Sequence, residues 1–445
     1  MNASAQKSLR VSFKDGIFAS AMIGFTQDYF TPFLLLLGAT AREVGILNSL
    51  PNFFSALVQL KSADLTEKVG SRKTIINNFV FLQALMLIPI AGVALKRGTA
   101  PFLFIILVTL FTSFGAFAVP AWMSLMSNLV EENKRGEYFG WRNRRLGFVI
   151  VAMSFMAGVI LHASEQRNIF AGFFLIFVLA FVFRLVSWNF LRQMEEPKLA
   201  HTEEDRFSLF RFLSRIKESN FARFVLFVSV MNFSVNIASP YFAVFMLRDL
   251  HFSYLLYSSL TVTATLMIYL TMSRWGRHAD KVGNLKILKT TAPIIALLPM
   301  LWVMSRNPIF LFLVQILSGF AWAGFNLCAL NFIYDAVTPT KRTRCIAYFN
   351  VLNGLALCLG AFLGGFLVRK LPPLFGYRFL TLFIFSSSLR MFVSLLLPLP
   401  LKEVRKVESV CSPDLILSML GFKPLDNLSP NVLRRPVDDI DHKET

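Results

Sequence analysis

An acidic residue, Asp28, lies about midway along a long apolar stretch near the start of the chain, in the sequence TQDYFTP. The stretch runs from about residue 14 to 37 and is long enough to cross a bilayer. A carboxylate at membrane depth costs about 2.5–3.5 kcal/mol on insertion scales and usually marks a proton or ion path. We therefore predict that Asp28 couples transport to a proton or cation. The structural alternative is an acid that pairs with a neighbouring polar group to fix helix packing.

Two loops carry a similar pattern of glycine and charge. The first reads ADLTEKVGSRK over residues 63–73, and the second reads GRHADKVGNLK over residues 276–286. An acid near a helix end beside basic residues could hold two helices together in one conformation and release them in another. We predict a latch made of these residues: Glu67, Lys68, Gly70, Arg72, Gly276, Asp280, Lys281, Gly283 and Asp335.

Three of the latch positions are glycines with distinct expected roles. Gly276 would let two helices approach closely at the membrane surface. Gly70 and Gly283 would permit a tight turn into the next helix. Asp335 ends a later apolar stretch and is expected to join the latch through Arg342 and Arg344.

The composition of the 445 residues excludes several classes of protein. Hydrophobic residues make up 55% and charged residues 16%, against about 25% charged in a soluble domain. A soluble enzyme, a disordered chain and a secreted disulfide scaffold are all disfavoured. The net charge of +19 is spread between apolar stretches, which favours anionic lipid headgroups over nucleic acid.

The sequence gives no support for a cofactor-binding site or a metal site. The four cysteines form no CxxC pair, and the five histidines are not clustered. No phosphate-binding G-x-x-x-x-G-K-[ST] motif is present, so an ATP-driven pump is not indicated. We expect no cofactor, no metal and no catalytic constellation, and hence no enzyme.

Twelve apolar stretches can each span a bilayer as a helix. They are 14–37, 42–62, 74–95, 101–128, 140–162, 168–191, 222–246, 253–273, 286–305, 308–335, 345–369 and 376–399. With the N-terminus inside, 34 of the 45 basic residues fall on the cytoplasmic side and 9 on the other. This asymmetry predicts an inner (plasma) membrane protein with both termini in the cytoplasm.

The chain divides into two six-helix sets that resemble each other. We predict bundles at 1–191 and 222–400, a linker at 192–221 with a basic amphipathic helix, and a cytoplasmic tail at 401–445. Matched features recur at offsets of 206 to 213 residues, which indicates an internal repeat. The pairs are Pro32 and Pro240, Gly70 and Gly283, Arg135 and Arg342, Asn143 and Asn350, and Arg184 and Arg390.

The second loop resembles the signature loop of the major facilitator superfamily, a family of secondary transporters. The first loop departs from that pattern at Ala63, where the family has glycine, and at Glu67, where it has aspartate. The resemblance, together with the twelve-helix plan over about residues 10–400, implies an all-α integral membrane fold of two six-helix repeats. It also implies alternating access around a central site.

The resemblance implies that helices 1, 4, 7 and 10 line the central cavity. The candidate coupling and substrate residues on those helices are Asp28, Gln27, Asn232, Asn236, Trp122, Gln315, Trp322 and Asn326. For each amide or tryptophan alone, packing between helices is the ordinary role. As a set, they suit a neutral, amphipathic or cationic solute. Arg184 and Arg390 lie inside peripheral helices, where snorkelling or pairing with a cytoplasmic-side acid is expected; an anion site is the alternative.

The sequence thus predicts a monomeric secondary transporter whose partners are a small solute, a proton or cation gradient and the bilayer. The alternative is a non-transporting membrane sensor or assembly partner on the same fold. The missing proline of helix 5 (LGFVIVAMSFMAG, residues 146–158) disfavours a drug–proton antiporter. The solute and the direction of transport stay open.

Overall fold

The computed structural model describes residues 3–96, 98, 100–130, 135–196, 219–337, 339–405, 407 and 412–420. Within these ranges the chain is almost entirely helical, and its only strand-like pairing is a bridge between Leu374 and Tyr377. The expected amphipathic helix of the linker, at 206–217, lies outside the described residues. We call residues 3–196 the first half of the chain and residues 219–405 the second half.

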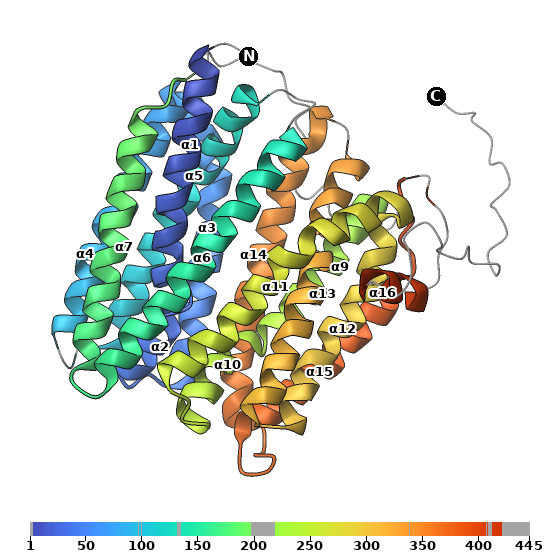
Figure 1. Ribbon diagram of the computed structural model, residues 1–445. Coiled ribbons are helices and arrows are strands. Elements are labelled where there is room, and N and C mark those ends of the chain that lie inside the picture. Colours follow the sequence, from blue (N-terminus) through green and yellow to red (C-terminus); the bar gives the residue numbers. More distant parts are fainter. Residues whose placement is uncertain are drawn as a thin grey trace, which may run out of the picture.

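Seven helical segments form the first half, on the left of Figure 1. They are α1 (Ala3–Thr26), α2 (Phe30–Leu36), α3 (Ala41–Val69), α4 (Arg72–Leu95), α5 (Pro101–Leu129), α6 (Arg135–Glu165) and α7 (Ile169–Arg192). Side-chain oxygens start several of these helices. Thr40 and Glu43 form a capping box at α3, and Ser71 and Asn168 cap α4 and α7.

The second half repeats this arrangement on the right of Figure 1. Its segments are α9 (Asn220–Asn236), α10 (Ser239–Val244), η2 (Phe245–Asp249), α11 (Tyr254–Val282), α12 (Asn284–Met304), α13 (Pro308–Ala336), α14 (Pro339–Lys370) and α15 (Arg378–Leu396). A short helix, α16 (Ser412–Leu420), follows the second half.

Ten helices among the described residues are long and apolar enough to cross a membrane. The first two of the twelve predicted stretches correspond to α1–α2 and to α3, which are not among the ten. The first path is broken into two segments, and Lys14 and Asp15 add charge to its early turns. The all-helical, multi-pass character is confirmed, and twelve crossings are consistent with the helices present.

The first membrane path of each half is interrupted at a matched place. In the first half α1 ends at Thr26 and α2 begins at Phe30; in the second half α9 ends at Asn236 and α10 begins at Ser239. Pro32 and Pro240 lie in the first turns of α2 and α10. Proline removes a backbone donor and disfavours a helical conformation in the residue before it, so the matched prolines account for breaks at these places.

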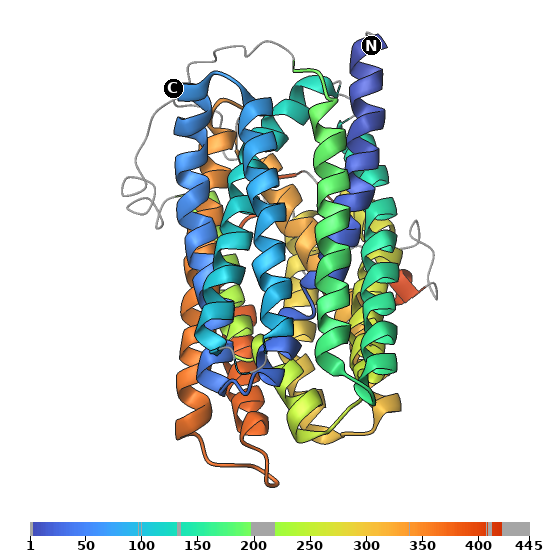
Figure 2. The same cartoon turned by 90° about the vertical axis from the view of Figure 1, so that its left-hand side faces the viewer.

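The two halves pack against each other mainly through two helix pairs, α3 with α14 and α6 with α11, and α10 adds smaller contacts with α2 and α3. In Figure 1, α6 and α11 lie next to each other where the two halves meet. The same view shows that α1 begins at the upper end of the molecule and that α2 lies at the lower end. Figure 2 shows the helices running along one common axis. We call the end that holds α2 and α10 the distal face.

Glycines allow the close approaches on which this packing depends. A Cβ at Gly158 would lie 2.1 Å from Ser258 Oγ of the other half, and one at Gly354 would lie 2.7 Å from Ala56 Cβ. On α14, Gly360 and Gly364 face the backbone carbonyls of Phe233 and Ile237. These glycines of α14, in the predicted stretch 345–369, therefore form a packing surface.

Gly319 provides a direct test of close packing within the second half. A Cβ there would lie 2.2 Å from the carbonyl oxygen of Ala264, so Gly319→Ala should force α13 away from α11. We expect a loss of about 1–3 kcal/mol of stability, as for other overpacked sites, read as a lower melting temperature in detergent. Gly92→Ala is the matched control, because nothing lies within 4 Å of its Cβ position. Equal melting temperatures for the two variants would contradict this packing.

Candidate functional site

Asp28 lies in the break between α1 and α2, at the contact between the two halves. Its carboxylate accepts a hydrogen bond of 2.8 Å from Ser154 Oγ on α6. Its backbone carbonyl accepts one of 2.7 Å from Tyr257 Oη on α11, in the other half. Among the described residues no basic side chain forms an ion pair with Asp28. Asp28 is thus partly buried and hydrogen-bonded, and no cation pairs with it in the described part of the chain.

Tyr29 extends this cluster across the same contact. Its side chain is fully buried, and its hydroxyl donates to the backbone carbonyl of Ser154. The same hydroxyl lies 2.7 Å from Ser258 Oγ of the second half. Neither Tyr29 nor Tyr257 was among the residues predicted from sequence, although Tyr29 directly follows Asp28.

The predicted amides of the second half mainly connect helices within that half. Asn232 Nδ2 donates to Asn353 Oδ1 at 2.7 Å, and Asn236 Nδ2 donates to the carbonyl of Leu357 at 2.6 Å, both on α14. Gln315 Nε2 donates to the carbonyl of Leu260 at 3.0 Å, which connects α13 to α11. In this conformation these three side chains perform the packing role, and solute contact stays a prediction.

The remaining predicted cavity residues are spread over both halves of the chain. Gln27 is exposed at the α1–α2 break, and Asn326 is exposed on α13. Trp322 packs edge-on against Phe325 at a centroid distance of 5.6 Å. Trp122 lies in the first half, where the Arg142 guanidinium stacks on its ring at 4.8 Å. Of the predicted set, Asp28 and Gln27 lie in the same turn, Asn232 and Asn236 lie one turn apart on α9, and Trp322 and Asn326 lie one turn apart on α13.

A second buried acid, Asp15 on α1, was not predicted as a site residue. Ser187 Oγ donates to Asp15 Oδ1 at 2.6 Å, and Arg184 donates to Ser187 Oγ at 3.0 Å. Arg184 also donates twice to Gln83 Oε1, at 2.6 and 2.9 Å. Arg184 is thus connected to an acid through a serine, close to the predicted pairing.

Arg390, the repeat partner of Arg184, is satisfied in a different way. Its side chain is buried and donates to Ser386 Oγ and to the carbonyls of Ile295 and Val235. No carboxylate among the described residues pairs with it, so the acid pairing is not seen for Arg390 in this part of the chain. Val235 lies in the last turn of α9, so the arginine binds where that helix ends.

The second loop of the predicted latch is held by a residue that the sequence did not indicate. Arg405, which follows α15, donates to Asp280 Oδ1 at 3.1 Å and pairs with Asp335 Oδ2 at 2.7 Å. Asn284 Nδ2 also donates to Asp335 Oδ2. Asp335 thus joins Asp280, as predicted, but through Arg405. The side chains of Arg342 and Arg344 lie outside the described set.

The first loop is held by Glu196, just after α7. Its carboxylate accepts hydrogen bonds from Ser71 Oγ and from the backbone N–H groups of Arg72 and Lys73. The buried Arg72 side chain pairs with the same carboxylate at 3.3 Å and donates to Ser124. The Glu67 side chain lies outside the described set, and Lys68 is exposed.

The same cap recurs in the second half, 207 residues later. Glu403 Oε2 accepts a 2.7 Å hydrogen bond from the backbone N–H of Leu285, in the first turn of α12. A carboxylate at a helix N-terminus satisfies free N–H groups and complements the helix dipole. Comparing the sequence with itself at this offset would have found Glu196 and Glu403 as a pair.

The three glycines of the predicted latch differ in backbone conformation and in the space around them. Gly70 and Gly283 have φ values of 70° and 86°, which confirms the predicted turns. A Cβ at Gly276 would meet only Leu327 Cδ2, at an ordinary 3.7 Å, so the predicted close approach is wrong for this conformation. Lys281 follows Asp280 at the end of α11 and is partly buried.

The described part of the predicted tail packs against the second half. Asn220 and Lys402 exchange hydrogen bonds of 2.8 and 3.0 Å. On α16, Leu415 and Met419 are buried, and Ser418 Oγ lies 3.1 Å from His278 Nε2 on α11. The described tail residues, 401–405 and 412–420, therefore pack with the second half.

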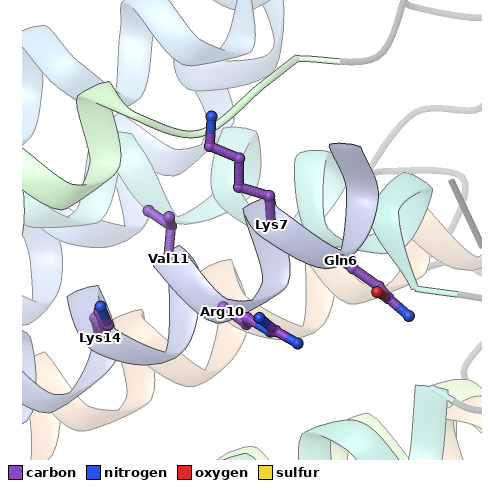
Figure 3. Close-up of a pocket in the computed structure, with 5 residues that line it drawn as sticks. All are labelled: Gln6, Lys7, Arg10, Val11 and Lys14. Carbon is purple, nitrogen blue, oxygen red and sulfur yellow. The ribbon is translucent and has the colours of Figure 1, made fainter. Parts of the chain in front are cut away.

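A small basic groove lies along the first turns of α1, at the end opposite the distal face. Figure 3 shows the five residues that line it, which are Gln6, Lys7, Arg10, Val11 and Lys14. The three cations are spaced by three and four residues, so they share one side of the helix. Their exposure is consistent with the predicted contact with anionic headgroups.

The cap at Glu196 makes a pH-dependent contribution to stability. Burial alone raises the pKa of Glu196, but the hydrogen bonds from Ser71, Arg72 and Lys73 hold the pKa of this carboxyl below its ordinary value of 4.5. A depressed pKa contributes stability above the unfolded-state value, and that contribution is lost as the pH falls through the folded-state value. Glu196→Gln should therefore melt lower than the parent at neutral pH, and the gap should narrow below pH 4.5.

Thermal melting of both proteins from pH 7 to pH 3 checks this expectation. Glu195→Gln is the matched control, because its side chain is exposed and next in sequence. A gap between Glu196→Gln and the parent that widens on acidification would contradict the assigned role of the cap.

Known proteins resemble this chain along most of its length. Residues 17–379 match the model of the MFS_1-like family. An uncharacterised transporter of Buchnera aphidicola is 29% identical over 132 residues, which span 29% of this chain and 32% of that protein. The aligned region thus covers about a third of that relative.

Three solved structures share the fold at low sequence identity. The nucleoside transporter NupG has a TM-score of 0.64 at 14% identity, covering 89% of this chain and 98% of that one. A bacterial homologue of the human lysosomal transporter Spinster, in an inward-facing and unoccupied conformation, scores 0.62 at 13% identity over 83% of each chain. The human organic anion transporter MFSD10 scores 0.58 at 15%, covering 89% of this chain and all of that one. Because the family match runs through both halves and both signature loops, the chain belongs to the MFS_1-like family of the major facilitator superfamily.

Proposed function

We propose that this multi-pass membrane protein is a secondary transporter that moves a small solute by alternating access of its two halves. Family membership supports this, as does a fold shared with three transporters. The repeated helix breaks support it as well, because transporters place solute and ion sites at interrupted helices. The predicted domains fit this mechanism: bundles at 1–191 and 222–400, connected by 192–221 and followed by a tail at 401–445.

The proposed coupling residue is Asp28. The observation that carries this role is a half-buried carboxylate, at a helix break between the halves, that accepts a hydrogen bond from Ser154 but has no cation beside it among the described residues. Such a group can bind and release a proton without leaving an unpaired positive charge in the membrane. Asp15 differs in this respect, because Ser187 connects it to Arg184.

In the proposed orientation the protein lies in the plasma membrane, and both termini are in the cytoplasm. The excess of basic residues at the end where α1 begins supports it. Under this orientation the distal face points outward. The hydrogen bonds between the halves at Asp28 and Tyr29 would then close the outer side, as in an inward-facing state.

The solute is proposed only by class. The amides and aromatics of the predicted cavity suit a neutral, amphipathic or cationic solute, with Gln27 and Asn326 exposed in this conformation. The structural neighbours carry different solutes, a nucleoside in one and organic anions in another. The shared fold therefore does not select among these classes, and the protein is expected to act as a monomer.

Replacing Asp28 by asparagine tests the coupling role. Asparagine keeps the shape and an oxygen that can accept the Ser154 hydrogen bond, but it cannot bind a proton. We expect Asp28→Asn to abolish gradient-driven accumulation in proteoliposomes and to leave solute counterflow intact. A thermal-shift screen of purified protein against a solute library at two pH values supplies the solute, because a ligand of the native state raises its melting temperature.

Ser154→Ala is the matched control, since it removes the hydrogen bond and keeps the carboxylate. It should retain accumulation with a changed pH dependence. Undiminished accumulation in Asp28→Asn would remove Asp28 from the coupling role. The absence of both a ligand and counterflow would instead favour a non-transporting sensor or assembly partner.

A further inference from the structure

The contact between the halves near Asp28 contains one hydrogen bond that differs from the others. Four hydrogen bonds between the halves are seen among the described residues. Two of them lie at the α1–α2 break: a partly buried one from Tyr257 Oη to the carbonyl of Asp28, and a buried one between Tyr29 Oη and Ser258 Oγ. The rings of the two tyrosines meet edge to face at 6.4 Å.

The Asp28 carbonyl is available to Tyr257 because of Pro32. In a continuous helix the N–H of residue 32 would donate to the carbonyl of residue 28. Proline has no N–H, so this carbonyl has no donor within its own helix. Tyr257 Oη is the only donor to it among the described residues. A carbonyl without a donor would be unfavourable here, because lipid offers none.

The two hydrogen bonds at the α1–α2 break differ in the number of hydroxyl protons available to them. Tyr29 and Ser258 each carry one hydroxyl proton. Tyr29 uses its proton toward the carbonyl of Ser154, and Ser258 lies 2.7 Å from the carbonyl of Tyr254 as a donor. No proton is left for the contact between Tyr29 and Ser258 unless one of those bonds is given up. Tyr257, by contrast, has a proton committed to Asp28 alone among the described residues.

We propose that Tyr257 is a positioning residue for transport, and that its hydrogen bond to the Asp28 carbonyl, made possible by Pro32, keeps the distal face closed. While it is formed, it fixes the turn that presents the Asp28 carboxylate to Ser154. Opening the distal face separates α11 from α1–α2 and requires this bond to break. Only the link to coupling rests on the proposed function; the closure itself does not.

The test measures accessibility of the distal face directly. A single cysteine is placed at Ser49, which is buried where α3 meets α14, in a protein whose four native cysteines are replaced. Its rate of labelling by a membrane-impermeant maleimide reports opening of that face. Tyr257→Phe removes one hydroxyl oxygen and should raise the rate about three- to tenfold, the effect of losing one hydrogen bond.

Pro32→Ala supplies the second arm. Alanine restores the N–H that competes for the Asp28 carbonyl, so this variant should also raise the labelling rate. Because both changes act on one hydrogen bond, the double variant should label no faster than the faster single variant. Tyr254→Phe is the matched control, since it removes a phenol one turn away on α11, and its rate should equal that of the parent.

Three results would overturn the proposal: an unchanged rate in Tyr257→Phe, an equal rise in Tyr254→Phe, or effects of the two changes that multiply. Thermal melting confirms that each variant is folded before labelling. The outcome is independent of the coupling test. Loss of accumulation in Asp28→Asn with an unchanged rate in Tyr257→Phe would retain the coupling role and reject the closure, and the reverse pattern would do the opposite.

Discussion

A backbone carbonyl inside a membrane must find a donor within the protein, since lipid supplies none. This constraint decides what surrounds each broken helix here. Pro32 frees the carbonyl of Asp28, and Tyr257 from the other half donates to it. At the end of α9 the carbonyl of Val235 accepts hydrogen bonds from the backbone N–H of Ala238 and from Arg390 on α15. At each break a side chain from another helix thus donates to a backbone carbonyl.

Much of this arrangement could be predicted from local pattern. The long apolar stretches gave the helices, the matched prolines gave the breaks, and Gly70 and Gly283 gave the turns, because each of these depends on neighbouring residues only. Asp28 was singled out because a carboxylate is rare in such a stretch. The surroundings of these residues could not be read in the same way.

The partners that hold the structure together are remote in sequence. Tyr257 lies 229 residues from Asp28, and Arg405 lies 125 residues from Asp280. Tyrosine and arginine are ordinary residues where they occur, so their types indicate no partner. For the amides, the residues were identified but their partners were not. Asn232 and Asn236 were predicted as candidate solute contacts, yet in this conformation both donate hydrogen bonds to α14. Whether an amide meets a solute or a helix depends on packing that no single sequence displays.

The positions of the two glutamate caps bear on where the polypeptide chain could be divided. Glu196 completes the start of α4, and Glu403 completes the start of α12, each from a position just past the last helix of its own half. Every contact of these caps stays within one half. A chain interrupted between residues 196 and 219 would leave both caps on the polypeptides that need them. A division of the chain at the linker is therefore compatible with both caps.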